Sequence, residues 1–319
     1  MALLRGGYRV RTTVRDLRKA DPVRTAVGRE VDPGGRLSFA AADLGDDAGW
    51  PAAVAGCDYV LHVASPPGGR TETPDELVAA AREGGLRVLR AAAAAGVRRV
   101  VLTSSCAAAG VPNSATEVTT DETVWTDPEQ PGLTAYRLSK TLAERAAWDF
   151  VETLPPASTT LTTILPGAIL GPVLGAADPG SVQVIGRLVT GKVPGSPRIE
   201  LEVVDVRDLA DLHVEAMTSA AAAGERFIAR GDPMLMPEIA ATVKAALGDR
   251  GARVPTRMIP DWVVRVMAVF DRSLRDIVPL LGRRNRHSPA KVQRLLGWQS
   301  RPSMQTVVDC AESLLAGRA

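Results

Sequence analysis

The first 171 residues alternate between short apolar runs of strand length and longer segments with helical spacing. Runs typical of strands lie at residues 8–14, 35–42, 57–63, 100–103 and 161–165. Helical patterns lie at residues 50–55, 74–95 and from Tyr136 onward. Strands that alternate with helices favour right-handed crossovers between parallel strands. The pattern therefore predicts an α/β fold built on a doubly wound parallel sheet.

The composition changes after residue 171, because residues 172–197 are rich in glycine and proline, and this change indicates a second domain. The segment 199–204 is typical of a strand, and a helix is expected at 206–218. Four further helical patterns lie at residues 236–247, 260–271, 289–296 and 303–315. We expect a nucleotide-binding domain at 1–171 and a smaller, mainly helical substrate domain at 172–319, from which some segments return to the first domain.

Composition and charge argue against several kinds of partner. A net charge of +2 and 4% aromatic residues do not favour nucleic acid. The three cysteines, Cys57, Cys106 and Cys310, are too few and too scattered for a disulfide framework or a metal site. No apolar run approaches the ~20 residues of a membrane span, and the first residues lack the apolar stretch of a signal peptide. We expect a protein of the reduced cytoplasm without a metal.

Tyr136 and Lys140 are four residues apart on one predicted helix. Residues at this spacing lie one above the other on the same helix face. A positive charge near a phenol favours the phenolate and lowers the tyrosine pKa from its usual value of about 10. The pair therefore suits acid/base catalysis, although an accidental surface pair has the same spacing.

Polar or small residues follow four of the predicted strands, where ligands bind in an open parallel sheet. These positions are Arg15, Asp43, the pair Ala64 and Ser65, and the pair Ser104 and Ser105. Ordinary turn chemistry and helix capping are the alternative explanation for each of them. A serine hydroxyl at a strand end before the tyrosine helix could hold a substrate carbonyl near the phenol.

Arg15 lies where the adenosine ribose of a dinucleotide would bind. An arginine there pairs with a 2′-phosphate, whereas an acidic residue would accept hydrogen bonds from a free 2′-hydroxyl. The sequence therefore favours NADP(H), with NAD(H) as the alternative because Asp16 follows directly.

With these residues in place, the chain resembles an extended short-chain dehydrogenase/reductase of the NAD-dependent epimerase/dehydratase superfamily. It is most similar to the dihydroflavonol reductase-like and aldehyde reductase-like branch. The matching stretches are residues 10–16, 56–66, 103–105, 136–148, 165–172 and 204–213. The resemblance implies a Rossmann-type sheet and reversible hydride transfer, in which NADPH reduces an aldehyde or ketone to an alcohol.

The resemblance also implies a role for each matching residue. Tyr136 would be the general acid/base, Lys140 would hold the nicotinamide ribose and lower the tyrosine pKa, and Ser105 would orient the carbonyl, with Ser104 the weaker choice. The implied cofactor-binding residues are Arg15, Asp43, Leu44, Ala64, Ser65, Ser104, Tyr136, Lys140, Pro166, Gly167, Ala168 and Ile169. The substrate is a small molecule, and both a monomer and a homodimer fit the fold.

Two departures from the family pattern qualify this hypothesis. The asparagine that follows the serine pair in flavonoid reductases is absent, because residues 107–110 read Ala-Ala-Ala-Gly. The first strand and the Gly-rich turn that cradles the pyrophosphate are also missing. Because that strand is central, its loss would leave two neighbouring strands unpaired, at about 1–3 kcal/mol for each buried group against a total stability of about 5–15 kcal/mol.

The departure at the start leads to two expectations. The chain as written would fold poorly or bind the cofactor weakly, and a recorded start too far downstream would account for the missing strand. Two other functions stay open: a nucleotide-sugar epimerase or dehydratase of the same fold, and a binding protein that lacks cofactor-dependent activity.

Overall fold

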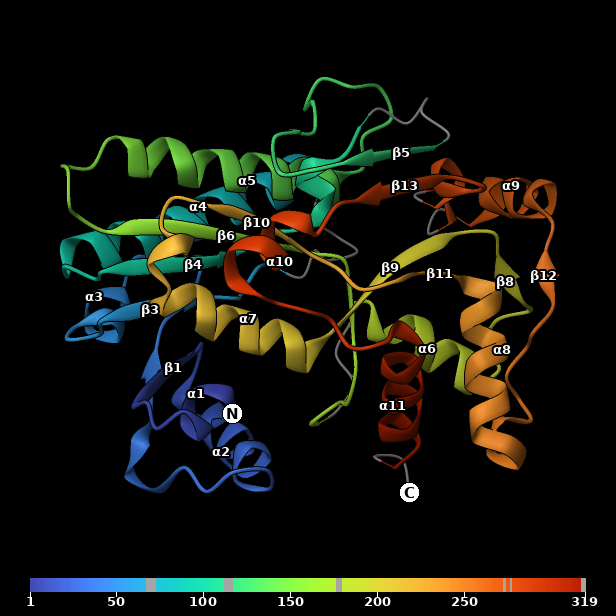
Figure 1. Ribbon diagram of the computed structural model, residues 1–319, viewed down its shortest axis with the longest axis horizontal. Helices are drawn as coiled ribbons and strands as arrows, with labels where there is room; N and C mark the ends of the chain where they lie inside the picture. The colour runs from blue at the N-terminus through green and yellow to red at the C-terminus, as the bar shows by residue number, and fades with distance from the viewer. Residues whose placement is uncertain (67–72, 112–116, 176–179, 272–273, 276, 317–319) are drawn as a thin grey trace. The chain divides into compact units, whose positions relative to one another are not determined.

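The structure is a computed structural model that describes residues 1–66, 73–111, 117–175, 180–271, 274–275 and 277–316. The helices are α1 (Ala2–Arg5), α2 (Ala20–Gly28), α3 (Trp50–Val54), α4 (Pro74–Ala94), α5 (Ala135–Glu152), α6 (Val182–Val189), α7 (Val206–Thr218), α8 (Met236–Leu247), α9 (Asp261–Phe270), α10 (Ala290–Leu296) and α11 (Ser303–Ala316). The strands are β1 (Val10–Val14), β2 (Leu37–Ala41), β3 (Tyr59–His62), β4 (Arg99–Thr103), β5 (Glu117–Thr120), β6 (Thr160–Pro166), β7 (Ala168–Leu170), β8 (Ser196–Pro197), β9 (Glu200–Asp205), β10 (Arg226–Ala229), β11 (Pro233–Leu235), β12 (Met258–Ile259) and β13 (Arg284–His287). Figure 1 shows these elements.

The chain forms two compact units that do not follow one boundary. The first unit comprises Met1–Ala108, Ala135–Leu165 and Ala210–Phe227, and the second unit comprises the remaining segments, Ala109–Thr134, Pro166–Leu209 and Ile228–Ala319. A single boundary after residue 171 therefore does not describe the chain. One segment from the C-terminal half, Ala210–Phe227, belongs to the first unit.

Parallel pairing in the first unit confirms the predicted α/β architecture. β3 pairs with β4 and β4 with β6, all parallel, in a four-stranded sheet of order β10-β6-β4-β3. β1 and β2 form a separate two-stranded parallel sheet in which Val10 lies opposite Leu37. Among the described strands, β1 and β3 each end their own sheet on one side. The gap between β1 and β3 is therefore at the position where the family pattern places its first strand.

Alternating residues of β4 contact different layers of the first unit, because successive side chains of a strand point to opposite faces. Val100 and Leu102 belong to a buried cluster with residues of α4 and α5, the two helices drawn along one side of this sheet in Figure 1. Arg99 and Thr103 point to the other face, where Arg99 donates to carbonyl oxygens at the end of α7 and Thr103 bonds to His213 of α7. Helices therefore contact both faces of the sheet.

The second unit has a three-stranded sheet of its own, in the order β11-β9-β7. β7 and β9 are parallel, and β11 is antiparallel to β9. Apolar side chains from α6, α8 and α11 pack with those of the sheet in one buried cluster. This unit is less helical than predicted, because the segments at 233–235, 258–259 and 284–287 add short strands.

Two helices were missed by the sequence interpretation. α2 carries Pro22 in its first turn, where a missing N–H is tolerated, and α6 contains Gly186 within a segment rich in glycine and proline. The buried residues of α6, including Ile185 and Leu188, show why it forms: one apolar face joins the core. Over the described residues, every helix is too short or too polar to cross a membrane.

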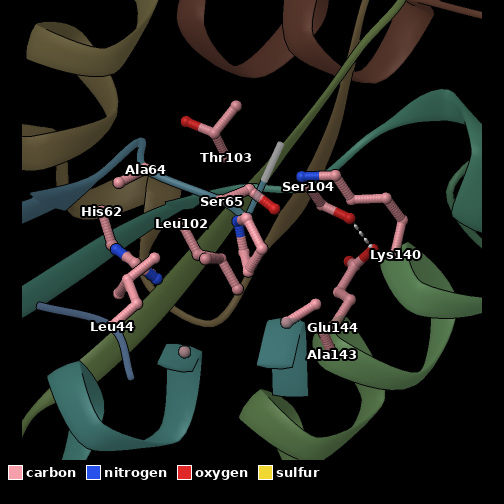
Figure 2. A pocket seen from close by; sticks show the side chains of 13 residues that line it. Leu44, His62, Ala64, Ser65, Leu102, Thr103, Ser104, Lys140, Ala143 and Glu144 are labelled. Carbon is pink, nitrogen blue, oxygen red and sulfur yellow. Dashed lines mark hydrogen bonds between the residues drawn. The ribbon is translucent and has the colours of Figure 1, made fainter. Parts of the chain in front are cut away.

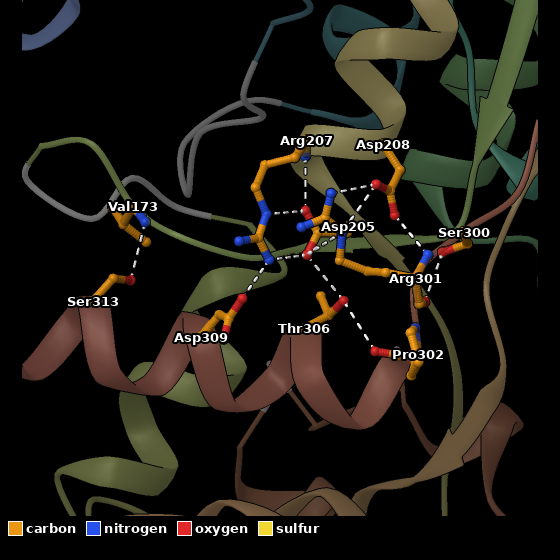
Figure 3. Close-up of polar contacts among 10 residues, drawn as sticks. All are labelled: Val173, Asp205, Arg207, Asp208, Ser300, Arg301, Pro302, Thr306, Asp309 and Ser313. Carbon is orange, nitrogen blue, oxygen red and sulfur yellow. Dashed lines mark hydrogen bonds and ion pairs between the residues drawn. The ribbon is translucent and has the colours of Figure 1, made fainter. Parts of the chain in front are cut away.

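A network of buried charges ties α7 to α11 in the second unit (Figure 3). The carboxylate of Asp205 is completely buried and accepts hydrogen bonds from Arg207 and Thr306. Arg301 pairs with Asp208 at 2.6 Å, and Arg207 also pairs with Asp309. The network connects the end of β9 to the C-terminal helix.

Candidate active site

Helix α5 carries three ionisable side chains on one face at successive turns: Tyr136, Lys140 and Glu144. The helix forms from strong helix formers such as leucine, alanine, lysine and glutamate. Burial increases along this face, because Tyr136 is 53% exposed, Lys140 is half-buried and Glu144 is 1% exposed. Tyr136 and Lys140 therefore lie on one helix, at the spacing that the sequence predicted.

Ser105 is the serine that faces the tyrosine. The Tyr136 hydroxyl donates to Ser105 Oγ at 3.4 Å, and the same oxygen accepts the backbone N–H of Ala107 at 3.2 Å. A long contact of this kind is usual before a substrate binds, since such hydrogen bonds tighten only in the complex. The geometry brings together the phenol and the hydroxyl that the sequence paired.

Ser104 points elsewhere. Its backbone N–H donates to the carbonyl of Ile164 on β6 at 2.7 Å, and its hydroxyl donates to Glu144 at 2.5 Å. The Glu144 carboxylate also accepts hydrogen bonds from Thr163 and Arg226, each at 2.8 Å. The two neighbouring serines thus have different partners, which supports Ser105 over Ser104 as the residue beside the phenol.

A cavity of about 30 Å³ lies between the ends of β3 and β4 and the helices α4 and α5 (Figure 2). His62, Ser65, Ser104 and Lys140 supply polar groups to its wall, and Leu44 closes one side. The volume suits a single water molecule and is far below that of a dinucleotide site. The cavity by itself is therefore too small to hold a dinucleotide.

Burial in this cavity perturbs two basic groups. It lowers the pKa of Lys140, and the negative charge of Glu144 opposes that change. Burial and the positive charge of Lys140 lower the pKa of His62 to about 4. His62 is therefore neutral near neutral pH.

The strand-end residues divide into those that line the cavity and those that do not. Leu44, Ala64 and Ser65 line it, whereas the side chain of Asp43 accepts the N–H of Gly45 in a turn at 2.8 Å. Arg15 follows β1 as predicted, and its side chain is exposed. These positions confirm the strand ends, while the cofactor roles stay predictions.

The segment from Pro166 to Ile169, which was predicted to bind the cofactor, joins two strands. Pro166 ends β6, and Ala168 and Ile169 begin β7 of the second unit. At Gly167 an added Cβ would lie 2.1 Å from the carbonyl oxygen of Glu202, so only glycine fits there. Close backbone approach explains this glycine.

The predicted site did not include two ionisable residues that line the cavity, Glu144 and His62. Glu144 was absent from the predicted site, although its spacing of four from Lys140 and eight from Tyr136 places it on the same helix face. His62 is buried, and it lines the cavity together with Lys140. The helical spacing could have identified the first of these residues.

Comparison with known proteins decides the family. Residues 1–229 match the family described as NAD dependent epimerase/dehydratase. The chain belongs to this family. This chain is 33% identical over 254 residues to anthocyanidin reductase of Arabidopsis thaliana. The alignment covers 75% of this chain and 73% of the relative. The chain is 32% identical over 255 residues to dihydroflavonol 4-reductase of Zea mays, covering 76% of this chain and 69% of the relative.

Solved structures agree with this assignment. The crystal structure of Gre2 from Candida albicans in complex with NADPH superposes with a TM-score of 0.81 at 25% sequence identity, and the match covers 99% of this chain and 94% of that chain. This chain therefore has the Rossmann-type fold that the resemblance implied.

Proposed function

We propose that this chain, an NAD(P)-dependent oxidoreductase, reduces an aldehyde or ketone to an alcohol with Tyr136 as the proton donor. The observation that carries the proposal is the arrangement of three side chains: the Tyr136 hydroxyl donates to Ser105, and Lys140 lies one turn further along the same helix. The reductase names of the curated relatives support the direction of the reaction. The substrate is a small-molecule carbonyl compound, and the protein acts in the cytoplasm as a monomer or homodimer.

The donor groups of the first unit fit a dinucleotide. Lys140 and the hydroxyl of Ser65 suit ribose hydroxyls, and the exposed guanidinium of Arg15 suits a 2′-phosphate. When bound, NADPH supplies a hydride to the carbonyl carbon. NADPH in complex with Gre2 of Candida albicans supports this choice over NADH.

The residues of the chain account for the proton. Ser105 would donate its hydroxyl hydrogen to the carbonyl oxygen and hold that oxygen beside the phenol. Tyr136 would then transfer its proton to the oxygen as negative charge develops there. The Lys140 ammonium would stabilise the resulting phenolate, because an opposite charge nearby favours the charged form. The phenolate recovers a proton from solvent before the next cycle.

A substrate panel tests the proposal. We expect purified protein to consume NADPH with small aldehydes and ketones, and we expect Ser105→Ala to lower kcat about 100-fold or more because it removes a donor to the reacting oxygen. Conversion of a nucleotide sugar without net loss of NADPH would instead support an epimerase. Absence of NADPH binding by calorimetry would support a binding protein and overturn the proposal.

A further inference from the structure

Glu144 is a buried carboxylate to which the proposed reaction gives no role. Its side chain is 0% exposed and is an acceptor for four donors. These are Ser104 Oγ at 2.5 Å, Thr163 Oγ1 at 2.8 Å, Arg226 Nε at 2.8 Å and the more distant Trp148 Nε1 at 3.5 Å. Three of these donors, from Thr163, Arg226 and Trp148, bond to Oε1, and Ser104 bonds to Oε2, so both oxygens of the buried carboxylate are hydrogen-bonded.

The position of Glu144 relates it to the reacting groups. It lies one turn beyond Lys140 on α5, and it holds the hydroxyl of Ser104, the residue directly before Ser105. Ser104 is fixed a second time through its backbone, which bonds to Ile164 of β6. The carboxylate therefore joins the carboxyl end of β4 to the helix that carries the tyrosine.

A buried carboxylate of this kind has an energetic cost that only paired charges offset. Its ion-pair partner Arg226 comes from β10, and the two charges meet at 2.8 Å with side-chain exposures of 9% and 0%. Lys140 lies one turn before Glu144 on the same helix and is itself half-buried. One carboxylate thus lies near both a structural arginine and the lysine of the proposed site.

We propose that Glu144 is a positioning residue, whose carboxylate holds Ser104, and with it Ser105, at the end of β4 and serves as the counter-charge of Lys140. The expected effect of Glu144 on catalysis rests on the proposed function. The electrostatic coupling of Glu144 to Lys140 can be measured without any enzyme activity.

The charges that face Lys140 agree with this role. Burial lowers the pKa of Lys140 and Glu144 raises it, so the carboxylate helps to keep the ammonium protonated. From β3 the facing group is His62, which is neutral near neutral pH because its pKa is about 4. From α4 the cavity is lined by Ala81 and Gly85, which do not titrate. Tyr136 and Glu144 share the helix of Lys140, and Arg226 of β10 donates to the Glu144 carboxylate.

Two variants separate the charge from the hydrogen bonds. Glu144→Gln keeps the size of the side chain and removes its charge, so Lys140 should lose its proton at lower pH. Thr163→Val is the matched control, because it removes one hydrogen bond to the same carboxylate and leaves every charge in place. If Arg226 without its partner prevents folding, combining Glu144→Gln with Arg226→Gln removes both charges of the ion pair.

The decisive measurement is competitive acetylation of the lysines across a pH series, read by mass spectrometry on the 319-residue chain. We expect the labelling midpoint of Lys140 to move to lower pH in Glu144→Gln and to stay in place in Thr163→Val. The other lysines, Lys19, Lys192, Lys244 and Lys291, are internal standards. An unchanged Lys140 midpoint in folded Glu144→Gln protein would overturn the inference.

Steady-state kinetics test the positioning role separately. In Glu144→Gln we expect kcat to fall about 10- to 100-fold and the alkaline limb of the pH profile to move to lower pH. In Ser104→Ala we expect a fall in kcat with that limb unmoved. A wild-type protein that reduces no carbonyl compound would refute the proposed function alone, since the acetylation result stands without turnover.

Discussion

The buried carboxylate of Asp205 supports a prediction whose magnitude follows from its contacts. It accepts Arg207 Nε at 2.9 Å and Arg207 Nη2 at 2.7 Å, accepts Thr306 at 3.0 Å, and lies 3.7 Å from Arg301. Replacing Asp205 by Asn keeps the shape and removes the charge that these cations face. Breaking a buried pair costs about 3–5 kcal/mol, and partial exposure of Arg207 places the expected loss near about 3 kcal/mol.

Asp309→Asn is the matched control for this prediction. Asp309 pairs with the same arginine, but both side chains are partly exposed, at 24% and 35%. Exposed pairs contribute about 0–1 kcal/mol. Each variant removes one negative charge from the same network, Asp205→Asn from a buried position and Asp309→Asn from a partly exposed one. A larger loss of unfolding free energy in Asp205→Asn would therefore reflect burial.

Urea unfolding followed by tryptophan fluorescence measures both losses, since Trp298 bonds to the backbone of Asp208 within the network. Burial acts to raise the pKa of Asp205, but the hydrogen bonds from Arg207 and Thr306 outweigh it and hold the pKa below its usual value. The stabilisation is therefore present above the unfolded pKa of about 4 and disappears as pH falls through the lower folded value. Equal losses for both variants at neutral pH would refute the reasoning.

Two further predictions concern the cofactor and the backbone. Arg15→Ala should raise the Kd for NADPH about 10- to 100-fold, because one charge-assisted contact to the 2′-phosphate is lost, and should leave NADH binding unchanged; equal effects on both cofactors in calorimetry would count against this role. Gly167→Ala should lower the Tm strongly because its Cβ would lie 2.1 Å from the Glu202 oxygen, whereas Gly28→Ala, with nothing within 4 Å, should not; similar Tm values for the two would contradict the steric argument.

The proposed catalytic residues were predictable because their signals are local. Tyr136 and Lys140 are one helical turn apart, and Ser105 is the second residue after an apolar run of strand length. Such patterns depend only on the periodicity of the chain. The sheet and most helices of the first unit were predictable for the same reason.

The surroundings of Glu144 were not predictable, because its partners come from distant segments. Ser104, Thr163 and Arg226 are 40, 19 and 82 residues away and meet the carboxylate only through the strand order. β10 was missed for a related reason, since four buried residues are too few to show a period. The two units likewise depend on contacts between separated stretches of chain, which no local pattern records.

Transfer of deuterium from NADPH labelled at C4 of the nicotinamide tests the central claim most directly. The two hydrogens at C4 are labelled in separate experiments, and the account predicts that one of the two labelled cofactors leaves one deuterium on the alcohol carbon of the product, as read by mass spectrometry. It also predicts that Tyr136→Phe lowers the rate about 100-fold or more. Product without deuterium from either label, or a Phe variant that reacts as fast as the wild type, would contradict it.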